Sequence, residues 1–357
     1  MEGKNMKKRI LALTLALAMS LSLVACGGGN AASEGGEIAI FWYTFGDTYL
    51  SSVRAAMNEA FNAAGVKFQD YDANNSQTTQ TEQIQTAITK GASCLVVNIV
   101  DANSDDATQA IIDMAVAAEL PLVFFNRSVS EELVSAYDKA AYVGTDYTMA
   151  GHMEGKMIGE FVLANYDAVD LNGDGEISYV MFMGEKGNNE AIYRTKYSLE
   201  NANAKLSAAG KKPLKFYDPS NPDKYLLDRD GKWSAQAANE YMTTILSSHS
   251  VANKNMVELI ICNNDGMAEG AISALTSSGY NTGKEGATAI PVFGVDATSA
   301  AKELIKGGRM AGTIKQDAEG MAKAILKCTE NGVAEKDLLD GMGDYNIDNS
   351  VDKVRIP

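Results

Sequence analysis

The feature that most constrains the fold of this chain is a regular alternation between short apolar runs and longer amphipathic segments. The apolar runs predict strands at Glu37–Tyr43, Val66–Asp72, Cys94–Asn98, Pro121–Phe125, Ala141–Val143, Ile177–Phe182, Leu259–Cys262 and Pro291–Val295. The amphipathic segments predict helices at Tyr49–Ala64, Gln77–Lys90, Asp105–Ala118, Tyr147–Tyr166, Glu190–Ala209, Trp233–Ser247, Gly266–Ser278 and Ala297–Lys306. Strands separated by helices of this length form βαβ units, so we predict an α/β fold with parallel sheets.

The length of the chain predicts two lobes. It has 357 residues, which is more than one hydrophobic core usually serves. Strand Leu259–Cys262 is apolar throughout, as expected for a sheet that is covered on both faces. We therefore expect two Rossmann-like lobes with parallel sheets.

Charge and composition exclude several classes of function. The formal net charge is -15, and an acidic surface repels phosphate backbones, so we expect no nucleic-acid partner. The only histidines are His152 and His249, which leaves little room for a histidine metal site or a histidine general base. Because no catalytic motif stands out either, we predict that the protein is not an enzyme.

The N-terminus resembles a bacterial lipoprotein signal. A basic stretch, Lys7–Arg9, precedes an apolar run, Ile10–Leu23, and small residues lead to Cys26. We predict a signal peptide at residues 1–25, a lipid on the Cys26 thiol and a flexible tether at residues 26–36. This places the protein outside the cell, anchored to the outer face of the cytoplasmic membrane. The alternative is an ordinary secretory signal with an incidental cysteine.

Polar side chains follow the predicted strands, at the edge where parallel sheets bind ligands. They are Asp47, Asp101, Glu185, Asn188, Glu190, Arg194, Asn263, Asn264, Asp265 and Asp296. No glycine-rich phosphate loop accompanies them, which argues against a nucleotide ligand. Carboxylates and amides saturate the hydroxyls of a sugar, and aromatic side chains such as Tyr49 and Trp233 can cover its apolar C–H faces. Taken on its own, Trp233 is better explained as a core anchor at the start of a helix.

Long stretches of the chain resemble the galactose/glucose-binding proteins of bacterial ABC importers. They are VVNIVD (96–101), LPLVFFN (120–126), AYDKAAYVGTD (136–146), DLNGDGEIS (170–178), IICNNDGMAEGA (260–271) and IPVFGVDA (290–297). The resemblance implies a type I periplasmic binding protein fold, in which a hinge joins the two lobes. It also implies a monomer that closes on one monosaccharide, galactose or glucose, and delivers it to an ABC permease in the membrane.

The resemblance also implies roles for individual residues. Asp47 would bond the hydroxyl at the carbon that distinguishes glucose from galactose, and Tyr49, a phenylalanine in the family, would stack opposite Trp233 across the sugar ring. The residues that match the family directly and would bond ring hydroxyls are Asn98, Arg194, Asn264 and Asp296.

Three predicted sugar contacts depart from the family pattern. Asn188 stands for a histidine, Glu190 for an aspartate and Gln316 for an asparagine. All three keep hydrogen-bonding capacity, but Glu190 and Gln316 each add a methylene to a tight cleft. A different monosaccharide, such as a pentose, therefore stays open.

The stretch 170–178 has the spacing of an EF-hand calcium loop with Gly175 at the turn. Loop ligands would come from Asp170, Asn172, Asp174, Glu176 and Ser178, with Glu176 donating its backbone carbonyl. The usual glutamate at position 12 is missing, because Met181 stands there. The resemblance implies that Glu258, on a remote strand, supplies it instead, and that the Ca²⁺ is structural. The alternative is a solvated acidic turn.

We expect the chain to cross between lobes near Leu120–Pro121 and near Lys315–Ala318, so that lobe one comprises residues 37–119 and 318–357 and lobe two residues 120–317. The family has a third crossing, and this chain stops at Pro357, about where it would begin. Either the chain is cut short there or lobe one lacks its last pieces.

Three other functions compete with transport. A glycoside hydrolase could use Asp47, Glu190 and Asp296 as its acids. A sugar-responsive transcription regulator shares the two-lobed fold, but it would need a DNA-binding N-terminus, where this chain has an export signal. A sensor that presents sugar to a chemoreceptor or a sensor kinase would bind the same ligand, so the sequence does not separate it from a transporter.

Overall fold

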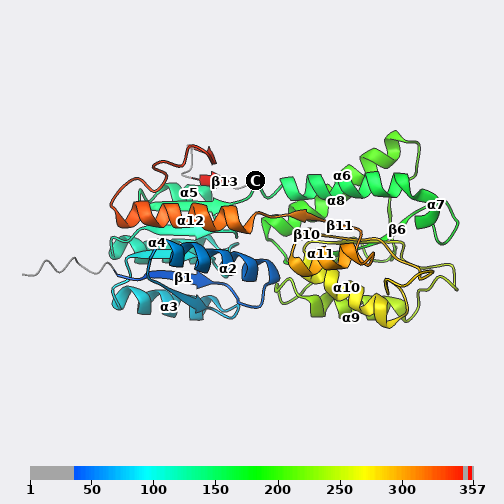
Figure 1. Ribbon diagram of the computed structural model, residues 1–357, viewed down its shortest axis with the longest axis horizontal. Coiled ribbons are helices and arrows are strands. Elements are labelled where there is room, and N and C mark those ends of the chain that lie inside the picture. The colour runs from blue at the N-terminus through cyan, green and yellow to red at the C-terminus, as the bar shows by residue number, and fades with distance from the viewer. Residues whose placement is uncertain (1–35, 349–352, 356–357) are drawn as a thin grey trace, which may run out of the picture. The chain divides into compact units, whose positions relative to one another are not determined.

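The computed structural model describes residues 36–348 and 353–355. The predicted signal peptide at 1–25, the lipidation site Cys26 and nearly all of the tether at 26–36 lie outside these residues. The described chain forms two α/β lobes, each built on its own sheet, which confirms the predicted fold class (Figure 1). None of the helices in this part of the chain has the length and apolar character that a membrane span needs.

Lobe one is built on a seven-stranded sheet in the order β12-β13-β5-β4-β3-β1-β2. Its strands are β1 (Ile38–Trp42), β2 (Phe68–Asp72), β3 (Cys94–Val97), β4 (Leu122–Phe125), β5 (Ala140–Gly144), β12 (Asn346–Asp348) and β13 (Lys353–Arg355). Every neighbouring pair is parallel except β12 with β13.

Helices cover both faces of this sheet. They are α2 (Thr48–Ala63) and α12 (Ala318–Val333) on one face, and α3 (Gln77–Thr89), α4 (Asp105–Ala117) and α5 (Glu131–Ser135) on the other. Successive residues of a strand point to opposite faces, so Ile38 and Ile40 join one core while Ala39 and Phe41 join the other. Because both cores are apolar, the central strands are continuous apolar runs.

Lobe two is built on a sheet of six parallel strands in the order β11-β10-β9-β6-β7, with β8 also pairing with β6. Its strands are β6 (Ser178–Met183), β7 (Lys215–Phe216), β8 (Leu226–Leu227), β9 (Leu259–Cys262), β10 (Val292–Asp296) and β11 (Gly312–Lys315). Its helices are α6 (Met149–Ala164), α7 (Tyr166–Val169), α8 (Asn189–Ala208), α9 (Ala235–Leu246), α10 (Asp265–Ser277) and α11 (Ser299–Lys306).

The predicted lobe boundary between residues 119 and 120 is wrong. Strands β4 and β5 both follow Leu120, yet they pair with β3 and with each other in the sheet of lobe one. Their side chains fill the lobe-one cores, where Phe124 and Phe125 are fully buried. The chain passes to lobe two only between β5 and α6, and it returns between β11 and α12.

A row of glycines brings two helices of lobe two into unusually close contact. Gly151, Gly155 and Gly159 recur at every fourth position of α6 and face α8. A Cβ atom at Gly155 would lie only 2.6 Å from the carbonyl oxygens of Tyr197 and Ser198. The backbone of α8, whose first two turns belong to the candidate site, is therefore held directly against α6.

Candidate functional site

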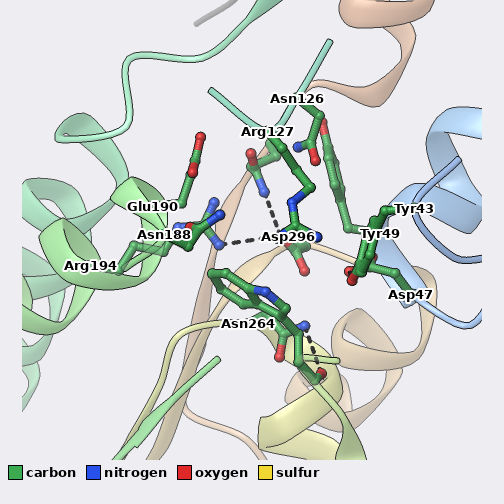
Figure 2. A pocket seen from close by; sticks show the side chains of 12 residues that line it. Tyr43, Asp47, Tyr49, Asn126, Arg127, Asn188, Glu190, Arg194, Asn264 and Asp296 are labelled. Atoms are coloured by element: carbon green, nitrogen blue, oxygen red, sulfur yellow. Dashed lines mark hydrogen bonds and ion pairs between the residues drawn. The ribbon is translucent and has the colours of Figure 1, made fainter. Parts of the chain in front are cut away.

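A pocket between the two lobes gathers most of the predicted sugar contacts (Figure 2). Its lining comprises Tyr43, Asp47, Tyr49, Asn126 and Arg127 from lobe one, Asn188, Glu190, Arg194, Trp233, Asn264 and Asp296 from lobe two, and Gln316 from the return crossing. Of the sugar contacts predicted from the sequence, only Asn98 is not part of this lining.

Three pocket side chains sit at helix N-termini, in the connections that follow strands β1, β6 and β9. The carboxylate of Asp47 accepts a hydrogen bond from Leu50 N at 2.9 Å and so caps α2. The amides of Asn188 and Asn264 cap α8 and α10 in the same way. Each cap fixes its own side chain at the carboxyl edge of a sheet, because the residue must satisfy the backbone of the helix that it begins.

Asp47 and Asn264 also hold the two sides of the pocket in place. The second oxygen of Asp47 accepts a hydrogen bond from the Tyr43 hydroxyl at 2.8 Å. The Asn264 amide donates to the backbone oxygen of Trp233 at 3.2 Å. The Trp233 ring in turn covers Gly184, where a Cβ atom would lie 2.2 Å from the ring, so only glycine fits beneath it.

Buried charges of opposite sign meet at the bottom of the pocket. Arg194 donates from Nη1 to the carbonyl oxygen of Asn263 at 2.8 Å and lies 3.9 Å from Asp296 Oδ1. Gln316 donates to the same Asp296 oxygen at 2.7 Å. In Figure 2 a dashed line joins Arg194 and Asp296.

Burial changes the proton affinity of these acids. It raises the pKa of the Asp296 carboxyl well above its usual value, although the nearby Arg194 guanidinium favours the charged form. Burial also raises the pKa of the Glu190 carboxyl, against the pull of Arg194 and Arg127. A ligand that donates hydrogen bonds to these carboxyls would stabilise their ionised form.

Several polar atoms of the pocket are buried without a hydrogen-bond partner. They are both carboxylate oxygens of Glu190, Oδ2 of Asp296, Oε1 of Gln316, Nε of Arg194, and Nε and Nη1 of Arg127. Buried polar groups are normally paired, because each unpaired one costs free energy. The pocket is thus built for a ligand rich in groups that both donate and accept.

Asn98 lies behind the pocket and braces it. Its side chain is fully buried, accepts from Tyr43 N at 3.3 Å and donates to the Phe125 carbonyl at 3.0 Å and to Asn126 Oδ1 at 3.3 Å. The amide therefore ties the ends of β1 and β4 together.

Sequence reasoning missed Tyr43, Asn126 and Arg127. Asn126 and Arg127 directly follow the predicted strand Pro121–Phe125, so the rule that ligands bind after strands points to them. The misplaced lobe boundary hid this signal, because it assigned that strand to the other lobe.

The backbone is strained at three positions of the pocket. Asn126, Trp233 and Asp296 have positive φ angles of 61°, 54° and 127°. Residues other than glycine rarely adopt such angles, and each such residue typically costs about 1–3 kcal/mol. The strain is consistent with side chains that are aimed at a ligand rather than chosen for stability.

The loop predicted to bind calcium lies against Glu258. Glu258 is fully buried, and its oxygens accept from the backbone N–H groups of Asn172 and Ser178, both at 2.8 Å. The Oδ1 atom of Asn172 is buried without a partner. Glu176 points its carboxylate away, to Lys212 and Lys215, which leaves only its backbone for the loop.

Among the described residues, no group of three or more His, Cys, Asp or Glu side chains is arranged to hold a metal ion. The three carboxylates of the predicted set, Asp170, Asp174 and Glu258, are therefore not arranged as such a group, and the set would also draw on the amide of Asn172, the hydroxyl of Ser178 and the Glu176 carbonyl. With Asp170, Asp174 and Glu258 present beside the unpaired Asn172 oxygen, the chemistry of the donor set fits Ca²⁺.

Comparison with known proteins identifies the family. The model of the periplasmic binding protein domain matches residues 38–333. The chain belongs to the periplasmic binding protein family. The resemblance found in the sequence is thereby confirmed, as is the type I fold.

Two relatives show how far the likeness of this periplasmic binding protein extends. It is 33% identical to the D-galactose/methyl-galactoside binding periplasmic protein MglB of Haemophilus influenzae, over 94% of this chain and 92% of that protein. It is 27% identical to a putative rhizopine-binding protein of Rhizobium meliloti, over 93% of each chain.

A solved structure shares the fold. An ABC transporter solute binding protein from Clostridium phytofermentans, crystallised with β-D-glucose, has a TM-score of 0.64 and 20% identity to this periplasmic binding protein. The match covers 82% of this chain and 83% of that one.

Proposed function

We propose that this protein captures a monosaccharide outside the cytoplasmic membrane and delivers it to the permease of an ABC importer. The observation that carries the proposal is the set of buried, unpaired donors and acceptors in the pocket that Tyr49 and Trp233 also line. A pyranose hydroxyl is both donor and acceptor, and its ring carries apolar C–H patches that aromatic side chains can cover.

Galactose or glucose is the ligand that we favour. The Haemophilus influenzae relative is named for D-galactose binding and is similar along nearly the whole chain. Asp47, which would read the carbon that distinguishes the two sugars, lines the pocket. Asn188, Glu190 and Gln316, the three departures from the family pattern, line it too, so a pentose is the alternative ligand.

Closure of the two lobes would be the mechanism. Pocket residues come from both lobes, and the chain crosses between them at β5–α6 and β11–α12. A sugar that bonds both lobes would stabilise the closed form over the open one. Small-angle scattering should show compaction when the sugar is added; an unchanged radius of gyration with a bound sugar contradicts this mechanism.

Calorimetry tests the proposed ligand. The purified protein is titrated with glucose, galactose, xylose, ribose and arabinose. We expect heat and a Kd in the micromolar range or tighter for glucose or galactose. Heat with a pentose alone would shift the proposal to that sugar, and no heat with any of them would refute monosaccharide binding.

We propose that the protein is not an enzyme, because its family binds solutes and two of its pocket acids are already engaged: Asp296 with Arg194 and Gln316, and Asp47 in helix capping. Release of reducing sugar from a disaccharide or an aryl glycoside would contradict this. A sensing role, in which the closed form contacts a chemoreceptor or a sensor kinase, is the alternative to transport. Deletion of the chain should abolish sugar uptake if it serves transport.

We propose that the loop at 170–178 holds a structural Ca²⁺ with Glu258. Asp170, Asn172, Asp174 and Glu258 would supply side-chain oxygens, Glu176 its carbonyl, and Ser178 a hydroxyl or a bound water. The ion would neutralise carboxylates that otherwise crowd one another. The buried, unpaired Oδ1 atom of Asn172 supports this proposal.

We propose that Cys26 carries a lipid anchor. The support is the basic and apolar signal before it and the small residues that lead to it. Growth with a labelled fatty acid should label the wild-type protein and leave the Cys26→Ser variant unlabelled. Equal labelling of both would refute the anchor.

A further inference from the structure

An ion pair joins the two lobes at the rim of the pocket. Arg127, which follows β4 in lobe one, donates from Nη2 to Oε2 of Glu185, which follows β6 in lobe two. The side chains are only 4% and 16% exposed. Charges this deeply buried are costly to desolvate, so the pair is stable only when both partners are in place.

The pair connects the aromatic walls of the pocket. Trp233 Nε1 donates to the same Glu185 oxygen at 3.3 Å. On the other side, the Arg127 guanidinium lies 4.3 Å from the centre of the Tyr43 ring, and the Tyr43 hydroxyl bonds Asp47. A chain of contacts therefore runs from Asp47 in lobe one, through the ion pair, to the Trp233 ring in lobe two.

Arg127 has N–H donors that are not used by the ion pair. It lines the pocket, where Figure 2 shows it beside Asn126, and its Nε and Nη1 groups are buried without a partner. Nη2 is used by Glu185, so the ion pair holds the guanidinium in one orientation. An acceptor placed in the pocket beside Nε and Nη1 would satisfy them.

Neutral bonds at the same rim are less buried. Asn189 Nδ2 donates to Ser128 Oγ at 3.0 Å, and Asn75 Nδ2 donates to the Asp230 carbonyl at 3.0 Å in an exposed position. Each also joins lobe two to lobe one. Because exposed neutral hydrogen bonds contribute less than buried charged ones, the Arg127–Glu185 pair is the stronger contact.

We propose that Arg127 is a further sugar-contacting residue, and that Glu185 is its positioning residue, which joins Arg127 across the cleft only when the lobes close. This inference rests on the proposed sugar-binding function. Closure forms the ion pair, aims two donors of Arg127 at the sugar and fixes the Trp233 ring by its indole N–H. The Arg127 guanidinium thereby takes part both in the contact that closes the lobes and in the contact with the sugar.

A double-mutant cycle tests the inference. The Kd for glucose and galactose is measured by calorimetry for wild type, Arg127→Met, Glu185→Gln and the double variant. We expect Glu185→Gln to raise the Kd about 10- to 100-fold in the wild-type background. In the Arg127→Met background the same change should alter the Kd by less than about 2-fold, because its partner is already gone.

Tryptophan emission gives a readout that a general loss of stability would not change. Trp42 is buried in lobe one and bonded to Asp70, so the change on adding sugar should come from Trp233. Glu185→Gln should diminish this change at saturating sugar while the apo melting temperature stays within a few degrees of wild type. The matched controls are Arg229→Met and Glu240→Gln, both exposed on lobe two, which should leave Kd and emission unchanged.

The outcomes are distinct. If the wild-type protein binds no sugar, the proposed function fails and this inference fails with it. If wild type binds but Arg127→Met and Glu185→Gln keep its Kd, or if Glu185→Gln weakens binding equally in both backgrounds, the inference alone is wrong.

Discussion

Replacing Gly155 of α6 with alanine should destabilise lobe two. The added Cβ would lie 2.6 Å from two backbone carbonyl oxygens of α8 and 2.8 Å from the Asn201 Cβ, where 3.4 Å is an ordinary contact. The helices must therefore separate by roughly 0.8 Å. None of the three nearest atoms is the end of a flexible side chain that could swing aside.

The magnitude follows from two opposing terms. Overpacking of this kind costs about 1–3 kcal/mol, and backbone obstacles place Gly155→Ala near the upper end. Alanine is favoured over glycine in a helix by about 1 kcal/mol. The net loss of unfolding free energy should be about 2 kcal/mol, or roughly 4 °C in melting temperature.

The assay is urea unfolding followed by circular dichroism, together with sugar titration. Because α8 carries Glu190 and Arg194, its displacement should also weaken sugar binding, by about 10-fold. The matched control is Gly159→Ala, whose nearest neighbours are Lys205 side-chain atoms at 2.9 Å, with no backbone atom nearer than 3.4 Å. The Gly159→Ala variant should lose less unfolding free energy than Gly155→Ala. If Gly155→Ala is as stable as wild type, the close packing of α6 on α8 is not what holds the two helices together.

Three further predictions concern the rest of lobe two. Chelation of Ca²⁺ should lower the melting temperature, and added Ca²⁺ should restore it. At a free Ca²⁺ concentration a hundredfold above Kd, the unfolding free energy should rise by about 2.7 kcal/mol. The Asp174→Ala variant should respond to neither treatment. Burial raises the pKa of Asp265 from 3.8 to about 6, so the folded state holds this proton more tightly. The contribution of Asp265 to stability should then fall by up to about 3 kcal/mol as pH rises from 4 to 7. In urea melts the stability of wild type should therefore fall relative to Asp265→Asn over that range, and parallel pH profiles would contradict the assignment. Asn281→Ala should cost about 2–4 kcal/mol in the same assay, because the buried amide bonds both backbone groups of Ile290 and the Arg309 carbonyl; a loss below 1 kcal/mol would show that water replaces it.

Local patterns predict most of the fold. Each expected strand and helix is present, because a parallel sheet covered on both faces leaves strong apolar runs separated by amphipathic helices. The pattern did not predict β7, β8, β11, β12 and β13, which are only two to four residues long. Such short strands, several of them partly exposed, carry too few apolar residues to stand out from loops.

The lobe boundary shows what local patterns leave undetermined. Pro121 before β4 resembles a linker signal, and nothing in the residues of β4 states which sheet it joins. That choice depends on pairing with β3 across a long helical connection. Only the three-dimensional arrangement of the strands decides it.

The candidate site was predictable where a residue both caps a helix and lines the pocket, as Asp47, Asn188 and Asn264 do. It was less so for Asn98, whose amide is used by Tyr43, Phe125 and Asn126. An asparagine amide can hydrogen-bond the hydroxyls of a sugar, and it can equally hydrogen-bond the backbone behind the pocket. Which of the two roles a residue has depends on whether its side chain reaches the pocket surface or lies behind it. The spacing of residues along the chain does not determine this depth.

The positive φ angles of Asn126, Trp233 and Asp296 have a consequence for engineering this protein. A selection for heat resistance alone would favour glycine at these positions, since it relieves the strain. Each such gain would delete a side chain that lines the pocket. Variants selected for thermostability without sugar should therefore accumulate substitutions that raise the melting temperature but weaken sugar binding. A screen that keeps sugar present throughout should leave these three positions unchanged.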